Sequence, residues 1–101
     1  MENITAAELK ERMDKGEKLN IIDVREEWEH DEFNIGGKLI PLGSLPQQLD
    51  QINNLKDEEL ILYCRSGNRS GKATQFLMSN GFTKARNLTG GMLEWQKSFP
   101  T

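Results

Sequence analysis

The sequence has little cysteine and no long apolar run. Of its 101 residues only Cys64 is a cysteine, so no disulfide can form within the chain. This usage is typical of a reducing compartment, and no basic segment followed by an apolar run marks the N-terminus as a signal peptide. We therefore expect a cytoplasmic protein. No stretch approaches the roughly 18 apolar residues of a membrane helix, so we expect no membrane association.

An excess of positive charge is also absent. The formal net charge is -3 at pH 7, which argues against general affinity for nucleic acid or anionic membranes. The chain has one histidine, His30, and no cluster of histidine and cysteine has metal-ligand spacing. We therefore expect neither a metal ion nor another cofactor.

The remaining composition fits one domain that covers residues 1–101. Apolar residues make up 36% of the chain and charged residues 29%, which is ordinary for a soluble globular domain with a modest core. Short apolar segments at 19–24, 38–40, 60–63 and 82–87 predict strands, and helical patterns lie between them. This alternation predicts an α/β domain with a mostly parallel sheet and helices on both faces.

Several local features predict where the helices lie. Thr5 and Glu8 have the spacing of a capping box, and Gly16 is a suitable stop for the helix that they begin. Ser44 is a candidate N-cap for a helix whose apolar face includes Ile52. We expect three aromatic residues outside these segments to lie in the core, namely Trp28, Phe33 and Trp95.

The candidate functional segment of the chain is residues 63–70, Tyr-Cys-Arg-Ser-Gly-Asn-Arg-Ser. They follow a predicted strand and precede a predicted helix, so Cys64 lies on the turn between them. A helix N-terminus favours anions, and Arg65 and Arg69 add positive charge nearby. A cysteine in such surroundings has a lowered pKa, and its thiolate is the nucleophilic form. We therefore prefer a nucleophilic Cys64 to an inert buried cysteine.

The rest of the loop suits an anionic substrate. Gly67 permits a backbone geometry in which successive N–H groups point inward. Arg65 is interpreted as a substrate-binding cation, in preference to a solvated side chain. Arg69 either binds the substrate or braces the loop against an acidic residue such as Asp23. The small polar residues of the loop keep it open, and they are Ser66, Asn68 and Ser70, of which Ser70 is also a candidate helix cap.

A second strand end is expected beside this loop. The segment 19–24 ends at Asp23, and ligands of parallel sheets bind beyond the carboxyl ends of the strands. Asp23 and Arg25 are interpreted as an ion pair that supports the loop. His30 lies in a strongly charged helix, so we interpret it as an exposed side chain and not as a catalytic base.

The segment Cys-Arg-Ser-Gly-Asn-Arg-Ser is similar to the active-site loop of rhodanese-like sulfurtransferases. Three other segments match the pattern of that family in the same order, at 23–26, at 40–42, and at 87–91 with Trp95 after it. The chain differs at 29–37, where many members have a Gly-His-Ile-x-Gly-Ala segment. The resemblance implies a single rhodanese-like domain with a five-stranded, mainly parallel sheet.

The resemblance also implies an activity, that of a thiosulfate sulfurtransferase. Cys64 would take a sulfane sulfur from thiosulfate or a persulfide donor and hold it as a persulfide. The sulfur would then pass to cyanide or to the thiol of a small molecule or protein. Because sulfite is a good leaving group, no general acid is needed.

Two other functions remain open. One is a cysteine phosphatase or arsenate reductase, whose loop has one more residue between its cysteine and its arginine. Here Ser70 stands at the position of that arginine, which favours a single sulfur atom over an oxyanion. The other is a non-catalytic binding or regulatory module, although such relatives usually lack the cysteine that this chain keeps.

Overall fold

A parallel sheet of four strands runs through the middle of the molecule in the order β2-β1-β3-β4. The structure is a computed structural model and describes residues 3–100. The strands are β1 (Asn20–Asp23), β2 (Lys38–Leu39), β3 (Leu60–Tyr63) and β4 (Ala85–Asn87). Four α-helices connect or flank them: α1 (Ala6–Asp14), α2 (Glu27–Glu32), α3 (Asn68–Ser79) and α4 (Gly91–Ser98).

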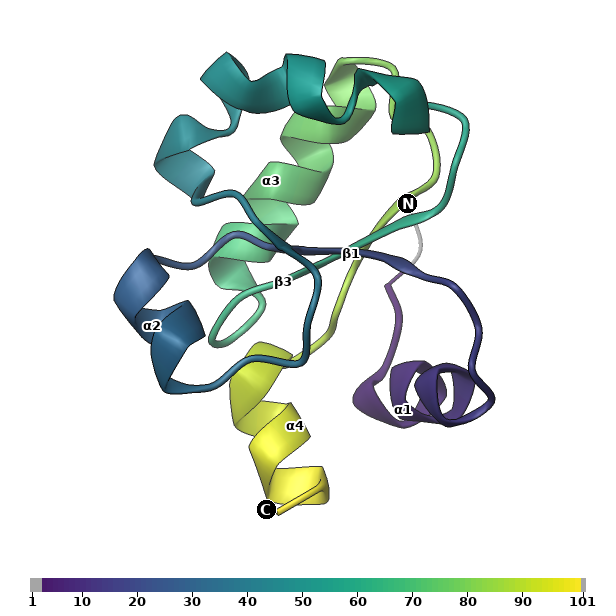
Figure 1. The fold of residues 1–101 in the computed structure, drawn as a ribbon, viewed down its shortest axis with the longest axis vertical. Coiled ribbons are helices and arrows are strands. Elements are labelled where there is room, and N and C mark those ends of the chain that lie inside the picture. Colours follow the sequence, from purple (N-terminus) through teal and green to yellow (C-terminus); the bar gives the residue numbers. More distant parts are fainter. Residues whose placement is uncertain (1–2, 101) are drawn as a thin grey trace.

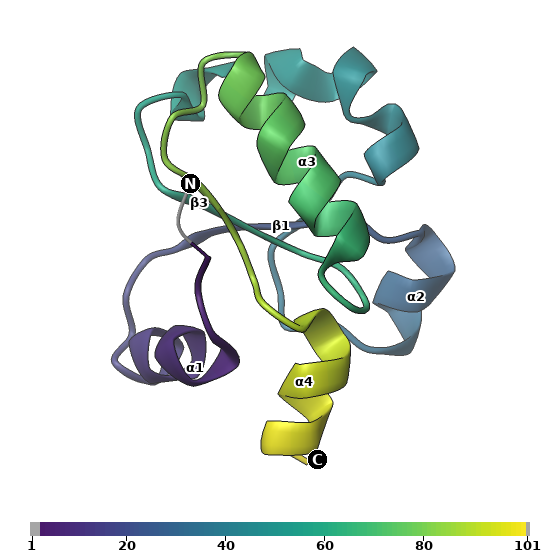
Figure 2. The same ribbon diagram turned by 180° about the vertical axis from the view of Figure 1, so that it is seen from behind.

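Helices cover both faces of this sheet, as the alternation of segments predicts. In Figures 1 and 2, α3 lies on one side of the strands, and α1 and α4 lie on the other. The central strand β3 supplies both cores, because successive side chains of a strand point to opposite faces. Leu60 and Leu62 join the cluster under α3, whereas Ile61 and Tyr63 join the cluster under α1 and α4.

The expectation of five strands is wrong for the described residues. Ile4, at the place where a fifth strand would start, makes only an isolated parallel bridge to Leu88. The reason is local, because Thr5 already caps α1 by accepting a hydrogen bond from the backbone N–H of Glu8 at 3.1 Å. The chain turns into a helix before a second ladder residue can pair.

The predicted helix after Ser44 is also different. Residues 42–55 form three short 3₁₀ turns, η1 (Leu42–Ser44), η2 (Pro46–Gln51) and η3 (Asn53–Leu55). Ser44 is the last residue of η1, and the N-cap position of η2 is taken by Leu45, not by Ser44. The i→i+3 bonds tighten the backbone around Pro46, which has no N–H to donate. Leu45 and Ile52 still reach the core, so the predicted apolar face is confirmed.

The three aromatic residues assigned to the core have different positions. Trp95 is buried, and Phe33 is partly buried against the cluster under α1 and α4. Trp28 is 67% exposed, so its assignment to the core is wrong. On the short helix α2, the side that packs inward holds Glu29, which is buried against Arg69, and His30, which is half-buried against Asp23, and Trp28 lies outside that side.

Within residues 3–100, no helix combines the length and the apolar character that crossing a bilayer requires.

Candidate active site

Cys64 directly follows β3 at the carboxyl edge of the sheet. The loop after it ends at Gly67, which caps α3 with a φ of 98°, a left-handed conformation that side chains other than glycine rarely adopt. On the other side of the loop, α4 approaches closely through Gly91. A Cβ atom on Gly91 would collide with the carbonyl oxygen of Cys64. The two glycines therefore let helix ends converge on the cysteine.

Hydrogen-bond donors converge on the Cys64 sulfur. The backbone N–H of Gly67 lies 3.1 Å from Sγ, and the backbone N–H and hydroxyl of Ser70 each lie 3.4 Å away. Cys64 is 1% exposed. Burial raises the pKa of the Cys64 thiol, but hydrogen bonds from Ser70, Gly67 and the Ser66 backbone outweigh burial and leave the pKa below its ordinary value. The site favours a thiolate.

Asn87, at the end of β4, holds this loop from behind. Its side-chain Nδ2 donates to the carbonyl oxygen of Gly67 at 3.1 Å, and its Oδ1 accepts from the Ser70 hydroxyl. Ser70 is buried in the first turn of α3 and is not the helix cap, because Gly67 occupies that position. In the sequence, Asn87 stands out only as part of the segment 87–91 that matches the family pattern. Its place at the carboxyl end of a strand was the signal that could have assigned it to the site.

Arg69 pairs with a carboxylate on the neighbouring helix α2 and thereby braces the loop. Its two terminal nitrogens donate to both carboxylate oxygens of Glu29 on α2, at 2.7 and 2.8 Å. The hydrogen bonds from Arg69 lower the pKa of Glu29 to about 2, although burial opposes them. Of the two roles left open for Arg69, this ion pair favours the one in which Arg69 braces the loop against an acidic residue. The partner is Glu29, which the sequence analysis did not single out, and not Asp23.

Asp23 supports the same edge from β1. Its carboxylate accepts from the Arg25 side chain at 2.8 to 3.2 Å, which confirms the predicted ion pair. His30 is half-buried and its Nδ1 lies 2.8 Å from Asp23 Oδ2, so the interpretation of His30 as an exposed side chain is wrong. Burial raises the pKa of Asp23, but hydrogen bonds from Arg25 and His30 outweigh it and lower the pKa.

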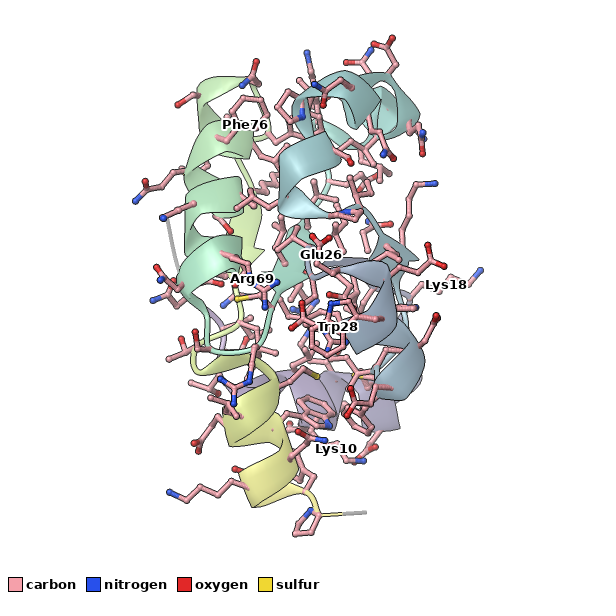
Figure 3. All side chains as sticks on the ribbon, turned by 90° about the vertical axis from the view of Figure 1, so that its left-hand side faces the viewer. Lys10, Lys18, Glu26, Trp28, Arg69 and Phe76 are labelled. Carbon is pink, nitrogen blue, oxygen red and sulfur yellow. The ribbon has the colours of Figure 1, made fainter. Side chains whose placement is uncertain are left out.

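Arg65 differs from the other cations of this edge. It is exposed, and within residues 3–100 it makes no hydrogen bond or ion pair through its side chain. It lines a cavity of about 390 Å³ together with Trp28 and Leu93. Figure 3 looks onto this edge, with Arg69 at the start of α3 and Trp28 on α2 facing the viewer. Ser66 and Asn68 are exposed beside Arg65.

In the described part of the chain, no group of three or more His, Cys, Asp or Glu side chains is arranged to hold a metal ion. The carboxyl edge of the sheet presents a buried thiol, N–H groups directed at its sulfur, and the guanidinium of Arg65, which has no ion-pair partner within residues 3–100.

Comparisons with known proteins agree with this geometry. Residues 5–98 match the family model described as the rhodanese-like domain. A crystal structure of a rhodanese-like domain protein from Staphylococcus aureus superimposes with a TM-score of 0.84 at 35% identity, covering 94% of this chain and 91% of that one. The chain therefore belongs to the rhodanese-like domain family.

Curated relatives include proteins named for sulfur chemistry. YtwF of Bacillus subtilis, named as a candidate sulfurtransferase, is 37% identical over 97 residues, which are 95% of this chain and 91% of YtwF. A sulfurtransferase of Allochromatium vinosum is 32% identical over 95 residues, 93% of this chain and 87% of that protein. YrkF of Bacillus subtilis, named as a candidate sulfur carrier, is 36% identical over 91% of this chain, which spans only 49% of YrkF.

Proposed function

We propose that this protein is a sulfurtransferase that carries a sulfane sulfur on Cys64 as a persulfide. The observation that carries the proposal is the convergence of the N–H groups of Gly67 and Ser70 and the Ser70 hydroxyl on one buried sulfur atom. Donors in this arrangement stabilise an anion at the start of a helix. The names of the relatives from Bacillus subtilis and Allochromatium vinosum support the same chemistry.

With thiosulfate as the donor, the reaction needs no acid and no redox partner. The Cys64 thiolate attacks the outer sulfur of thiosulfate, a sulfur–sulfur bond forms to Cys64, and sulfite leaves with the electron pair of the bond that breaks. The terminal sulfur of the persulfide occupies the region to which the loop N–H groups point. A thiolate acceptor or cyanide then attacks that sulfur, and Cys64 is released as the thiolate.

The residues of the loop divide into two roles. Arg65 attracts the anionic donor, because its guanidinium is free of carboxylates within residues 3–100. The backbone of Ser66, Gly67, Asn68 and Ser70 surrounds the transferred sulfur. Arg69 acts through Glu29, and keeps the first turn of α3 against α2.

The phosphatase alternative is disfavoured at Ser70. That position corresponds to the oxyanion-binding arginine of cysteine phosphatases, and here it holds a short hydroxyl directed at Cys64 and Asn87. A non-catalytic module would not need three hydrogen-bond donors directed at a buried Cys64 sulfur. Among sulfur donors, thiosulfate is the first to test, because it is the anionic donor proposed to bind Arg65.

The test is the intact mass of the protein before and after thiosulfate, and again after a small thiol. We expect the mass of one sulfur atom to be gained and then lost to the thiol. In Cys64→Ser the gain should disappear while the fold persists, since serine is nearly the same size. A wild-type protein that gains no sulfur from thiosulfate or from a small persulfide, or an equal gain in Cys64→Ser, would contradict the proposal.

A further inference from the structure

Two large apolar side chains are exposed among residues 3–100, and both line a cavity that Arg65 also lines. Trp28 on α2 is 67% exposed and Leu93 on α4 is 47% exposed. They line the same cavity of about 390 Å³, which we call the α2–α4 groove, and Phe33 and Met92 line it too. Apolar side chains exposed together, unlike scattered ones, mark an interaction surface.

The α2–α4 groove is fixed to the cysteine loop. The backbone N–H of Met92 donates to the carbonyl oxygen of Cys64, and that of Leu93 donates to the carbonyl oxygen of Arg65, both at 2.9 Å. The Arg65 side chain itself lines the groove. A molecule bound there would therefore contact Arg65, the residue that follows Cys64 in the loop.

The charges of the groove are mostly neutralised. Arg25 is bound to Asp23, and Glu29 is bound to Arg69. Within residues 3–100 this leaves Arg65 and Glu32 as the lining charges without an ion-pair partner. An occupant that complements the groove thus carries an apolar group for Trp28 and Leu93 and an acidic group for Arg65, with no further acid near Glu32, which would repel it.

We propose that the α2–α4 groove binds an extended polypeptide segment of a protein acceptor, with a bulky apolar residue beside the acceptor cysteine and an acidic residue toward Arg65. This inference rests on the proposed function. The chain has one cysteine, so the persulfide must leave to another molecule. Thiosulfate, cyanide and glutathione have no apolar group to cover Trp28 and Leu93, whereas a polypeptide segment can supply one.

The transfer step balances without an oxidant. The thiolate of the acceptor cysteine attacks the outer sulfur of the Cys64 persulfide, the sulfur–sulfur bond to Cys64 breaks, and Cys64 leaves as a thiolate. The acceptor cysteine becomes the persulfide.

The experiment uses the full chain loaded with sulfur and three synthetic peptides that each contain one cysteine. The first peptide has leucine beside the cysteine and a nearby aspartate, the second replaces leucine with serine, and the third replaces aspartate with lysine. N-acetylcysteine is the small acceptor. Below saturation we expect the first peptide to react about tenfold faster than the second, because a leucine side chain is removed from water. The lysine peptide should also be slower than the first.

The double variant Trp28→Ala/Leu93→Ser should lose the preference for leucine, while its rate with N-acetylcysteine stays that of the wild type. Both side chains are exposed, so the fold should persist, and Gln75→Ala on the far part of α3 serves as the matched control.

Equal rates with the leucine and serine peptides, or a preference that persists in the double variant, would overturn the inference alone. A dependence on Trp28 and Leu93 with coenzyme A as acceptor, but with no peptide, would also overturn it. Failure of the wild type to load sulfur would overturn the proposed function, and this inference with it.

Discussion

The two ends of the sheet each hold a carboxylate that two side chains share, yet the surroundings of the two carboxylates differ. At the amino end of β3, Glu59 accepts from Arg12 of α1 at 2.7 and 3.0 Å and from Arg86 of β4 at 2.8 Å. At the carboxyl end, Asp23 accepts from Arg25 and lies against His30. Both carboxylates have lowered pKa values.

The difference lies in what stands beside each network. Around Glu59, the guanidiniums of Arg12 and Arg86 are both paired, and the result is a link between α1, β3 and β4. Around Asp23, the neighbouring loop keeps Arg65 unpaired within residues 3–100 and aims backbone N–H groups at the Cys64 sulfur. We interpret the paired charges as stabilising the fold and the unpaired donors as the proposed anion site. The predictions below test this division.

The largest expected effect is on stability at the carboxyl end. Asp23→Asn removes the charge that faces Arg25 and His30, and Asp23 is fully buried. We expect a loss of about 3 kcal/mol in the free energy of unfolding, because a buried cation loses its partner. Urea denaturation measures this loss. The exposed Asp50→Asn is the control, and an equal small effect of the two changes would argue against a structural role for Asp23.

At the amino end of β3 we expect a smaller loss of stability and no change in the rate of sulfur transfer. Glu59→Gln leaves Arg12 and Arg86 facing each other, but Glu59 is 31% exposed, so solvent screens part of the repulsion. The free energy of unfolding should fall by about 1–2 kcal/mol, with an unchanged rate of sulfur transfer per folded molecule. Glu58→Gln, at an exposed neighbouring position, is the matched control. A slower transfer in Glu59→Gln would mean that the two ends are coupled.

The smallest expected effects separate the two arginines of the loop. Arg65→Gln should raise the KM for thiosulfate about tenfold, by loss of a charged contact to the donor, and leave unfolding unchanged. Arg69→Gln should lower the free energy of unfolding by about 1 kcal/mol, because Glu29 loses its partner while Arg69 is partly exposed. Steady-state kinetics and urea denaturation of both variants test the pattern, and the reverse pattern would exchange the roles of the two residues.

Local patterns in the sequence were enough to predict the α/β fold class and the position of Cys64 between a strand and a helix. The apolar segment 60–63 became the fully buried central strand, and Thr5 caps its helix as its spacing predicts. The family segments were enough for the membership of the chain, because they match in order over most of its length.

Contacts between distant residues could not be predicted in this way. Arg69 and Glu29 are 40 positions apart, and Ser70 and Asn87 are 17 apart. Which acid meets which arginine depends on how α2 sits against α3, and no local periodicity encodes that. Trp28 was misassigned for a related reason. Its apolar character predicted burial, but Glu29 and His30 take the inward face of a helix only six residues long.

The central claim is that the loop holds Cys64 as a thiolate, and titration of the ultraviolet absorbance of the thiolate tests it most directly. Hydrogen bonds to the charged form lower a pKa, so Cys64 should titrate below the ordinary pKa of a free cysteine. As the pH falls, activity should persist until the pH passes below the pKa of Cys64. Ser70→Ala should raise the pKa of Cys64 through loss of the hydroxyl that donates to its sulfur, and Cys64→Ser supplies the blank. A pKa at or above about 8.5 in the wild-type protein, unmoved by Ser70→Ala, would contradict the account.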